Sequence, residues 1–135
     1  MALFDWNDSY SVRVKVIDEQ HKHLVGILNN LHDAMTKGCA PGVTSPLLQE
    51  LAEYTQTHFA AEEGFMERAA YPGLRLHRGH HRELTKQVED FVVRHKRGEV
   101  ALSIGLMNFL HDWLKNHIMK EDKEYGPWLN EHGLQ

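Results

Sequence analysis

Four stretches of the chain carry apolar residues at helical spacing, and this pattern constrains the fold more than any other feature. In the first stretch, at about 17–38, apolar side chains recur at intervals of three, four and seven. This spacing collects them on one face of an amphipathic helix. The same pattern predicts further helices at about 45–70, 75–97 and 100–125. The first stretch contains Ile17, Leu24, Ile27, Leu28, Leu31 and Met35.

Glycine and proline separate these stretches, as expected for residues that interrupt a helix. Ser45-Pro46 is a typical helix start, because serine is a good N-cap and proline suits the first helical position. We therefore expect the second helix to begin there and the fourth to stop at Gly126-Pro127. The other breaks are Gly38, Pro41-Gly42, Tyr71-Pro72-Gly73 and Arg97-Gly98.

Four helices with short connections predict an all-α fold, an up-down-up-down antiparallel four-helix bundle. Residues 1 to about 16 are predicted to form an irregular N-terminal arm. In that segment Asn, Asp and Ser side chains compete for backbone hydrogen bonds, and Val12, Val14 and Val16 alternate as in an extended strand. Trp6 is expected to anchor the arm to the bundle. No repeat or linker interrupts the pattern, so we expect one domain over residues 1–135.

Composition excludes several partners. The formal net charge of -4 provides no basic surface of the kind that binds nucleic acid or anionic membranes. Apolar runs fall short of the roughly 20 residues needed to span a membrane. The N-terminus lacks the features of a signal peptide. Cys39 is the only cysteine, so no intrachain disulfide can form, and we expect a loop thiol on the solvent side. These absences favour a cytoplasmic protein.

Histidine is the unusual component, with 11 residues in 135. Each predicted helix places at least one histidine or carboxylate on its apolar face. Imidazole and carboxylate groups are common metal ligands, whereas the cysteines of zinc fingers and iron–sulfur clusters are missing. The candidate ligands are His21, His58, Glu62, His77, His81, His117 and Asp122.

Spacing within the helices supports a shared site. Residues four apart lie about 40° apart around a helix, so His58 with Glu62, and His77 with His81, can each bind from one face. His117 and Asp122 are five apart, which is about 140° on a regular helix. Directing both inward needs a π-bulge, a local unwinding or a long side-chain reach, and we expect an irregularity between the two residues.

A single histidine on an apolar face is most often a hydrogen-bonded core residue, and one pair at this spacing arises readily by chance. Seven such groups on four helices are different, because buried polar groups without partners would strongly destabilise a small core. Metal coordination satisfies all of them together. The whole set therefore predicts a metal centre, although no single pair does.

The motifs that carry these residues resemble those of the bacterial hemerythrin family, over essentially the whole chain. All seven ligand positions of the family are matched in order. The resemblance implies a four-helix bundle and reversible dioxygen binding for transport, storage or delivery at a non-haem di-iron centre. The matching segments are Asp18-Glu19-Gln20-His21, His58-Phe59-Ala60-Ala61-Glu62-Glu63 with Met66, Tyr71-Pro72, His77 and His81, and Trp113-Leu114-Lys115-Asn116-His117-Ile118 with Asp122.

The resemblance also assigns roles. One iron would be bound by His77, His81 and His117. The other would be bound by His21 and His58 and would keep one open position. Glu62 and Asp122 would bridge the two irons, together with an oxo or hydroxo group. The remaining histidines are expected at the surface or beside the ligands: His23, His32, His80, His95, His111 and His132.

Reversible binding requires a dry pocket, because water and protons promote oxidation of the iron. Leu114, one turn before His117, is the best candidate for a residue beside bound oxygen. The same residues also suit an ordinary bundle core. The predicted oxygen pocket comprises Leu24, Phe59, Trp113, Leu114 and Ile118. We expect no enzymatic activity, a monomer, and an oxygen-consuming enzyme as a candidate recipient.

Other functions remain open on the sequence alone. A di-iron enzyme could act on nitric oxide, peroxide or ferrous iron without an additional acid–base residue. A sensor or interaction module could use the same site, although such modules are usually fused to signalling domains. Zinc is less suited, because seven ligands fit two octahedral metals better than tetrahedral zinc.

Overall fold

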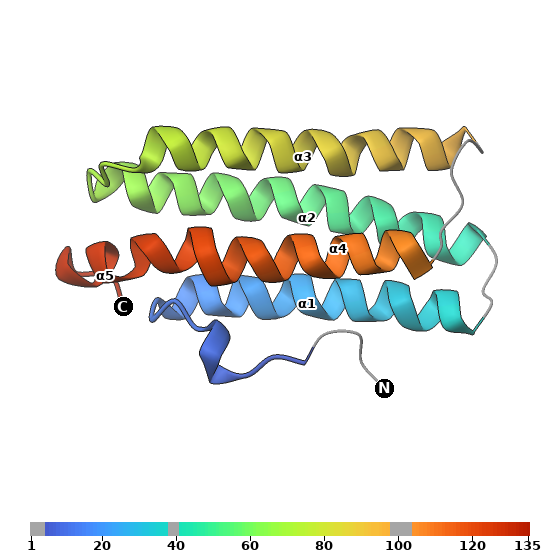
Figure 1. The fold of residues 1–135 in the computed structure, drawn as a ribbon, viewed down its shortest axis with the longest axis horizontal. Helices are drawn as coiled ribbons and strands as arrows, with labels where there is room; N and C mark the ends of the chain where they lie inside the picture. The colour runs from blue at the N-terminus through green and yellow to red at the C-terminus, as the bar shows by residue number, and fades with distance from the viewer. Residues whose placement is uncertain (1–4, 38–40, 98–103) are drawn as a thin grey trace.

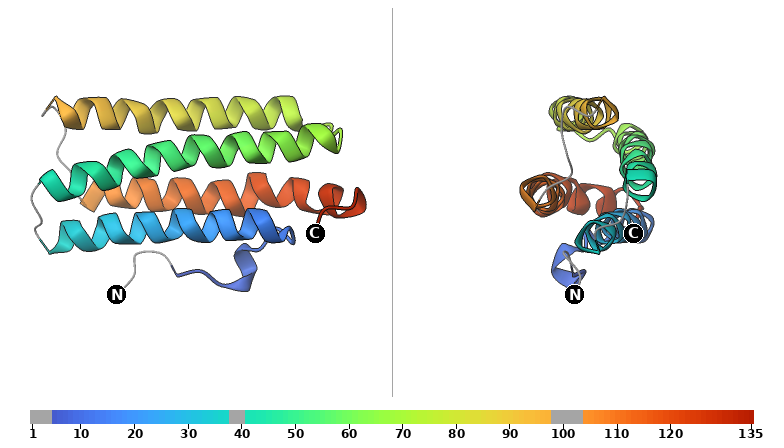
Figure 2. Two further views of the ribbon diagram at one scale, coloured as in Figure 1. Left: turned by 180° about the vertical axis from the view of Figure 1, so that it is seen from behind. Right: turned by 90° about the vertical axis from the view of Figure 1, so that its right-hand side faces the viewer.

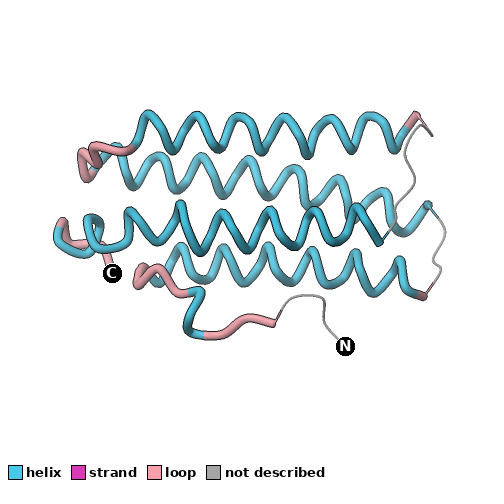
Figure 3. Tube along the Cα trace, viewed as in Figure 1, coloured by secondary structure: helices cyan, strands magenta, loops and turns pink. Residues whose placement is uncertain are grey.

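Four long helices run antiparallel to one another in a computed structural model that describes residues 5–37, 41–97 and 104–135 (Figure 1). They are α1 (Lys15–Thr36), α2 (Pro41–Arg68), α3 (Leu74–Lys96) and α4 (Ile104–Asn116). Successive helices reverse direction, so the predicted up-down-up-down bundle is confirmed (Figure 2). Within those residue ranges the chain forms helices and loops but no strand (Figure 3).

The fourth helix changes its geometry before it ends. A π-helical segment, η2 (His117–Asp122), follows α4, and α5 (Lys123–Glu131) continues beyond it. The predicted stop at Gly126-Pro127 is therefore wrong. Gly126 is needed for packing, because a Cβ there would lie 2.6 Å from the carbonyl oxygen of Val12. Pro127 is the middle residue of the short helix α5, where its missing N–H removes a single helical hydrogen bond.

The start of α2 also differs from expectation. The helix begins at Pro41 rather than at Ser45, so Pro46 lies inside it. The physical reason is that Pro41 itself suits the first helical position. Pro46, close to the helix start, then costs only one hydrogen bond to a preceding carbonyl. The predicted break at Gly98 and the loop position of Cys39 fall outside the described residues.

The N-terminal arm is irregular, as predicted, apart from the short 3-10 turn η1 (Asp8–Tyr10). Asp18 in the first turn of α1 ties the arm down. Its carboxylate accepts hydrogen bonds from the Val12 amide at 2.9 Å and the Ser11 hydroxyl at 2.6 Å. Val16 was expected in the extended segment but belongs to α1, where it is exposed. Trp6 packs against the larger apolar cluster of the bundle, as expected of a residue that anchors the arm.

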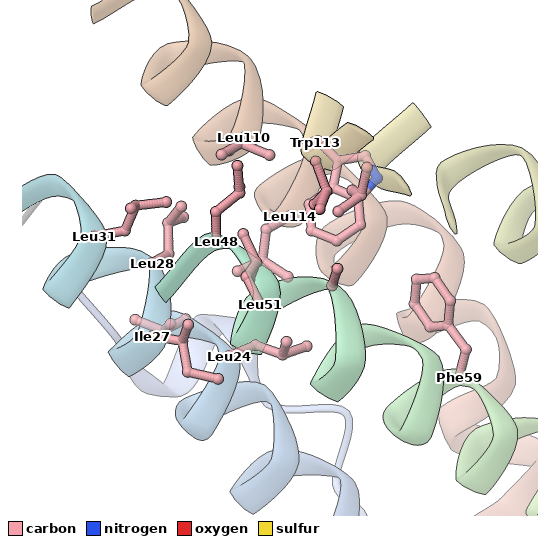
Figure 4. Close-up of a cluster of buried hydrophobic side chains, with 14 of the residues drawn as sticks. Leu24, Ile27, Leu28, Leu31, Leu48, Leu51, Phe59, Leu110, Trp113 and Leu114 are labelled. Atoms are coloured by element: carbon pink, nitrogen blue, oxygen red, sulfur yellow. The ribbon is translucent and has the colours of Figure 1, made fainter. Parts of the chain in front are cut away.

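Two apolar clusters fill the interior. The larger one joins α1, α2, α3 and the α4–η2 segment, and includes leucines of α1, α2 and α4 that gather between these helices (Figure 4). The smaller cluster joins the arm to α2 and α5 through Val12, Met66 and Tyr125. Polar candidate ligands lie buried in the same interior. No helix within the described parts of the chain is both long and apolar enough to cross a membrane.

Candidate metal centre

All seven predicted ligands meet inside the bundle. Each has at most 4% of its surface exposed. They come from α1, α2, α3 and η2, so every long segment of the bundle contributes. The residues are His21 on α1, His58 and Glu62 on α2, His77 and His81 on α3, and His117 and Asp122 on η2.

The donor atoms form two groups that share both carboxylates. In each group the nitrogen and oxygen atoms lie within 4.8 Å of one another. One group contains three histidines, His77, His81 and His117, and the other contains His21 and His58. Glu62 and Asp122 belong to both groups. The structure thus separates the histidines into three and two, with shared carboxylates between them.

The two oxygens of Glu62 face different histidine groups. Its Oε1 lies 3.1 Å from Nε2 of His21 and also contacts Nε2 of His58. Its Oε2 lies 3.3 Å from Nε2 of His81 and 3.6 Å from Nε2 of His77. One oxygen therefore faces each histidine group, as required of a carboxylate that bridges two metal ions.

Asp122 repeats this arrangement from the other side of the cluster. Its Oδ2 lies 2.9 Å from Nε2 of His21. Its Oδ1 lies 3.1 Å from Nε2 of both His77 and His117. Two carboxylates in the same orientation define a pair of positions that are each surrounded by imidazole nitrogens and carboxylate oxygens.

The π-helical segment explains how His117 and Asp122 both reach this cluster. A π-helix closes hydrogen bonds five residues apart, so residues at that spacing lie one above the other. η2 begins at His117 and ends at Asp122. The predicted irregularity between these residues is confirmed, and it is a π-helix over the full interval.

Two of the clustered histidines, His21 and His77, bind protons strongly in the metal-free fold. Burial lowers the pKa of His21 and of His77. Hydrogen bonds to Asp122 and Glu62 outweigh burial and raise both pKa values from 6.5 to about 9. At neutral pH, protons therefore occupy positions that a metal cation would take.

The carboxylates stay charged in this environment. Burial raises the pKa of Glu62, but the charge and hydrogen bonds of His58 and His21 hold that pKa well below its usual value. Burial and the charge of Glu62 raise the pKa of Asp122, yet contacts with His117 and His21 lower it overall. Two buried negative charges therefore face five imidazoles.

This donor set fits metal ions. Nε2 of His81 and Oε2 of Glu62 are buried and face each other without a hydrogen bond between them. A buried polar atom without a hydrogen bond is costly, and a shared cation relieves that cost. Imidazole nitrogens and carboxylate oxygens in this proportion suit a first-row transition metal better than calcium or magnesium, which prefer oxygen ligands.

The predicted oxygen-pocket residues all lie in the larger apolar cluster. Each is at least 93% buried, with exposed fractions from 0% to 7%. Phe59 stacks on the His81 ring, with centroids 3.8 Å apart and planes within 3°, and its centroid lies 5.1 Å from that of His117. We call these five residues the apolar wall, and their role as an oxygen pocket stays a prediction. The wall consists of Leu24, Phe59, Trp113, Leu114 and Ile118.

Three residues beside the cluster had no role assigned from the sequence. The His58 Nδ1–H donates to Oε1 of Gln20 at 2.6 Å. Glu63 lies 3.5 Å from Nδ1 of His81. Burial and the nearby carboxylates raise the pKa of Tyr125, so this fully buried phenol beside His77 stays neutral. Gln20 and Glu63 adjoin ligands in sequence, but only helix packing reveals that each contacts a ligand from another helix.

The other six histidines lie outside both donor groups. His23 packs against Tyr54 at a centroid distance of 4.2 Å, and His95 hydrogen-bonds with the Ser45 hydroxyl. His132 stacks on Trp128. His32, His80 and His111 are partly exposed, which agrees with the expectation that the remaining histidines lie nearer the surface.

Known proteins resemble the chain along almost its whole length. A bacteriohemerythrin of Stenotrophomonas maltophilia is 36% identical over 98% of this chain and 85% of its own. One from Pseudomonas aeruginosa is 38% identical over 93% of this chain and 80% of its own. One from Methylococcus capsulatus is 33% identical over 96% of this chain and 99% of its own.

Solved structures agree with the sequence comparison. The crystal structure of a wild-type hemerythrin superposes with a TM-score of 0.90 at 32% identity, and covers 95% of this chain and 98% of its own. The profile of the hemerythrin HHE cation binding domain matches residues 12–129. That span contains all seven clustered ligands and the wall of apolar residues around them. The chain therefore belongs to the hemerythrin HHE cation-binding family.

Proposed function

We propose that this protein binds dioxygen reversibly at a non-haem di-iron centre. The observation that carries the proposal is the orientation of Glu62 and Asp122. Each carboxylate directs one oxygen to the group with His21 and the other oxygen to the group with His77 and His81. Membership of the hemerythrin family and the buried cluster of histidines and carboxylates both fit a non-haem iron role in oxygen binding. Iron would supply the two electrons that dioxygen accepts.

The residues favour one open position. The group with His77, His81 and His117 offers five residues, including both shared carboxylates, whereas the group with His21 and His58 offers four. If the two metals have equal coordination numbers, the position beside His21 and His58 is one donor short. A small ligand would bind there.

The surroundings favour binding over turnover. Leu24 and Leu114 have at most 1% of their surface exposed, so this part of the core offers neither water nor a proton donor. The phenol of Tyr125 is buried beside His77, and its raised pKa disfavours proton release. A site that holds oxygen without supplying protons supports release of the same molecule.

The direct test is a spectrum of the ferrous protein under argon, in air, and again under argon. We expect two irons per chain and a visible absorption band that appears in air and disappears when oxygen is removed. The Glu62→Ala variant should lose the band, whereas Glu67→Ala, at an exposed position on the same helix, should retain it. A band that does not reverse, or consumption of peroxide or nitric oxide at a steady rate, would favour an enzyme instead.

A further inference from the structure

We propose that Glu63 is a positioning residue for His81. Its carboxylate accepts the Nδ1–H of His81 and thereby directs Nε2 of the same ring toward the metal. The inference rests on the proposed function only in treating the buried cluster as a metal centre.

The hydrogen on Nδ1 of His81 needs an acceptor close to the ring. An imidazole that binds metal through Nε2 carries its hydrogen on Nδ1, and that hydrogen requires an acceptor. Nδ1 of His81 is buried and has no hydrogen bond, while Oε2 of Glu63 lies 3.5 Å away. A small rotation of the Glu63 side chain closes this gap. Phe59 stacks flat on His81 and fixes the plane in which the two atoms meet.

Arg78 holds Glu63 in place from the solvent side. Its Nε lies 3.1 Å from Oε1 of Glu63, and its Nη2 lies 3.2 Å from Oε2 of Glu67. The guanidinium thus engages one oxygen of Glu63 and leaves the other directed at His81. With 23% of the Glu63 side chain exposed and 3% of the His81 side chain, this contact joins the surface to the buried cluster.

The Nδ1 atom of His58 also has an acceptor, but this acceptor is neutral. The His58 Nδ1–H donates at 2.6 Å to the amide oxygen of Gln20. A carboxylate acceptor makes an imidazole a stronger donor to metal than an amide acceptor does. The three-histidine group therefore has a charged outer partner, and the two-histidine group has a neutral one. This difference would stabilise a higher positive charge on a metal held by His77, His81 and His117.

Zinc is the probe for the test, because it is diamagnetic and the measurements then depend on neither iron redox chemistry nor oxygen. In the zinc-loaded protein we expect the Nδ1 proton of His81 to give a downfield signal that exchanges slowly with water. Glu63→Ala should shift this signal upfield, speed its exchange, and weaken zinc binding by about 10-fold or more. Glu63→Gln, which keeps an acceptor oxygen, should restore the slow exchange.

Glu67→Ala is the matched control, since Glu67 shares Arg78 with Glu63 but contacts no histidine of the cluster. It should leave both the His81 signal and the zinc affinity unchanged. The proposal is overturned if Glu63→Ala changes neither quantity, or if Glu67→Ala changes them equally. Failure of reversible oxygen binding in the iron protein would overturn the proposed function and leave this result standing.

Discussion

Leu114 lies one helical turn before His117, and its side chain is almost fully buried among the leucines of the larger core cluster. A Leu114→Thr substitution places a hydroxyl in this dry wall and stabilises water or a proton donor beside the centre. We expect several-fold faster autoxidation of the oxygenated protein, measured as decay of its absorption band. The reason is that one new hydrogen bond contributes about 1 kcal/mol, which corresponds to roughly a fivefold change in rate.

Leu31→Thr is the control for the loss of stability that any such substitution causes. Leu31 is equally buried in the same cluster but lies on α1, well along the helix from His21. Both variants should unfold at lower temperature, and only Leu114→Thr should oxidise faster. Equal autoxidation rates in the two variants would remove Leu114 from the oxygen pocket.

Protons and metal compete for His21 and His77, whose pKa values are raised to about 9 in the metal-free fold. Metal uptake near pH 7 should therefore release protons, and metal affinity should rise as the pH increases toward 9. Calorimetric titrations in buffers of different ionisation enthalpy measure the number released. Metal uptake without proton release would contradict the pairing of protonated His21 and His77 with Asp122 and Glu62.

The same shifts give the sign of the pH effect on folding. A histidine with a raised folded-state pKa stabilises the fold below its unfolded value of 6.5, and this contribution disappears as the pH rises through about 9. The free energy of unfolding of the metal-free protein should thus fall between pH 6.5 and 9. In the metal-loaded protein the metal takes the place of the additional proton and each ring keeps a single N–H, so this slope should vanish.

At the scale of elements, α5 and the N-terminal arm meet at Gly126. A Cβ at this position would lie 2.6 Å from the Val12 carbonyl oxygen, and that backbone cannot move without disturbing the hydrogen bonds to Asp18. Gly126→Ala should lower the free energy of unfolding by about 1–3 kcal/mol, the usual cost of overpacking. Chemical denaturation measures this change.

Gly79→Ala on α3 is the matched control. Nothing lies within 4 Å of a Cβ built there, and alanine favours a helix interior over glycine by roughly 1 kcal/mol. Both glycines lie in helices, yet Gly126→Ala should lower the free energy of unfolding and Gly79→Ala should raise it. Tolerance of Gly126→Ala would show that the arm does not pack this closely on α5, and destabilisation by Gly79→Ala would contradict the open space around that position.

At the scale of the whole molecule, the proposed metal centre would join α1, α2, α3 and η2, the continuation of α4. Seven buried polar groups from these four segments would lose a common partner if the metal were removed. A ligand that binds only the folded state stabilises it by about 2.7 kcal/mol at a hundredfold excess over its dissociation constant. The melting temperature should rise by several degrees with ferrous iron and fall again with a chelator. Magnesium at the same concentration, which prefers oxygen ligands, should have no effect.

Most of the predicted architecture follows from sequence patterns within single helices. Helical periodicity and glycine or proline breaks suffice to place four helices and their order, since each depends on neighbours in the chain. The spacing of five between His117 and Asp122 even implied the π-helix, because a regular helix could not direct both residues inward. Two predictions based on residue type are wrong. Pro46 lies inside α2 instead of starting it, and Gly126 allows close packing against Val12 instead of ending a helix.

The identities of the seven clustered residues were thus set by the sequence alone, through helical spacing and the cost of burying polar groups without partners. Tertiary structure decided which oxygen of Glu62 and Asp122 faces which histidines, and that Gln20 and Glu63 serve His58 and His81. Such contacts join α1 with α2 and α2 with α3 across the bundle. Helix rotation and side-chain direction determine them, and neither leaves a periodic signal in the chain.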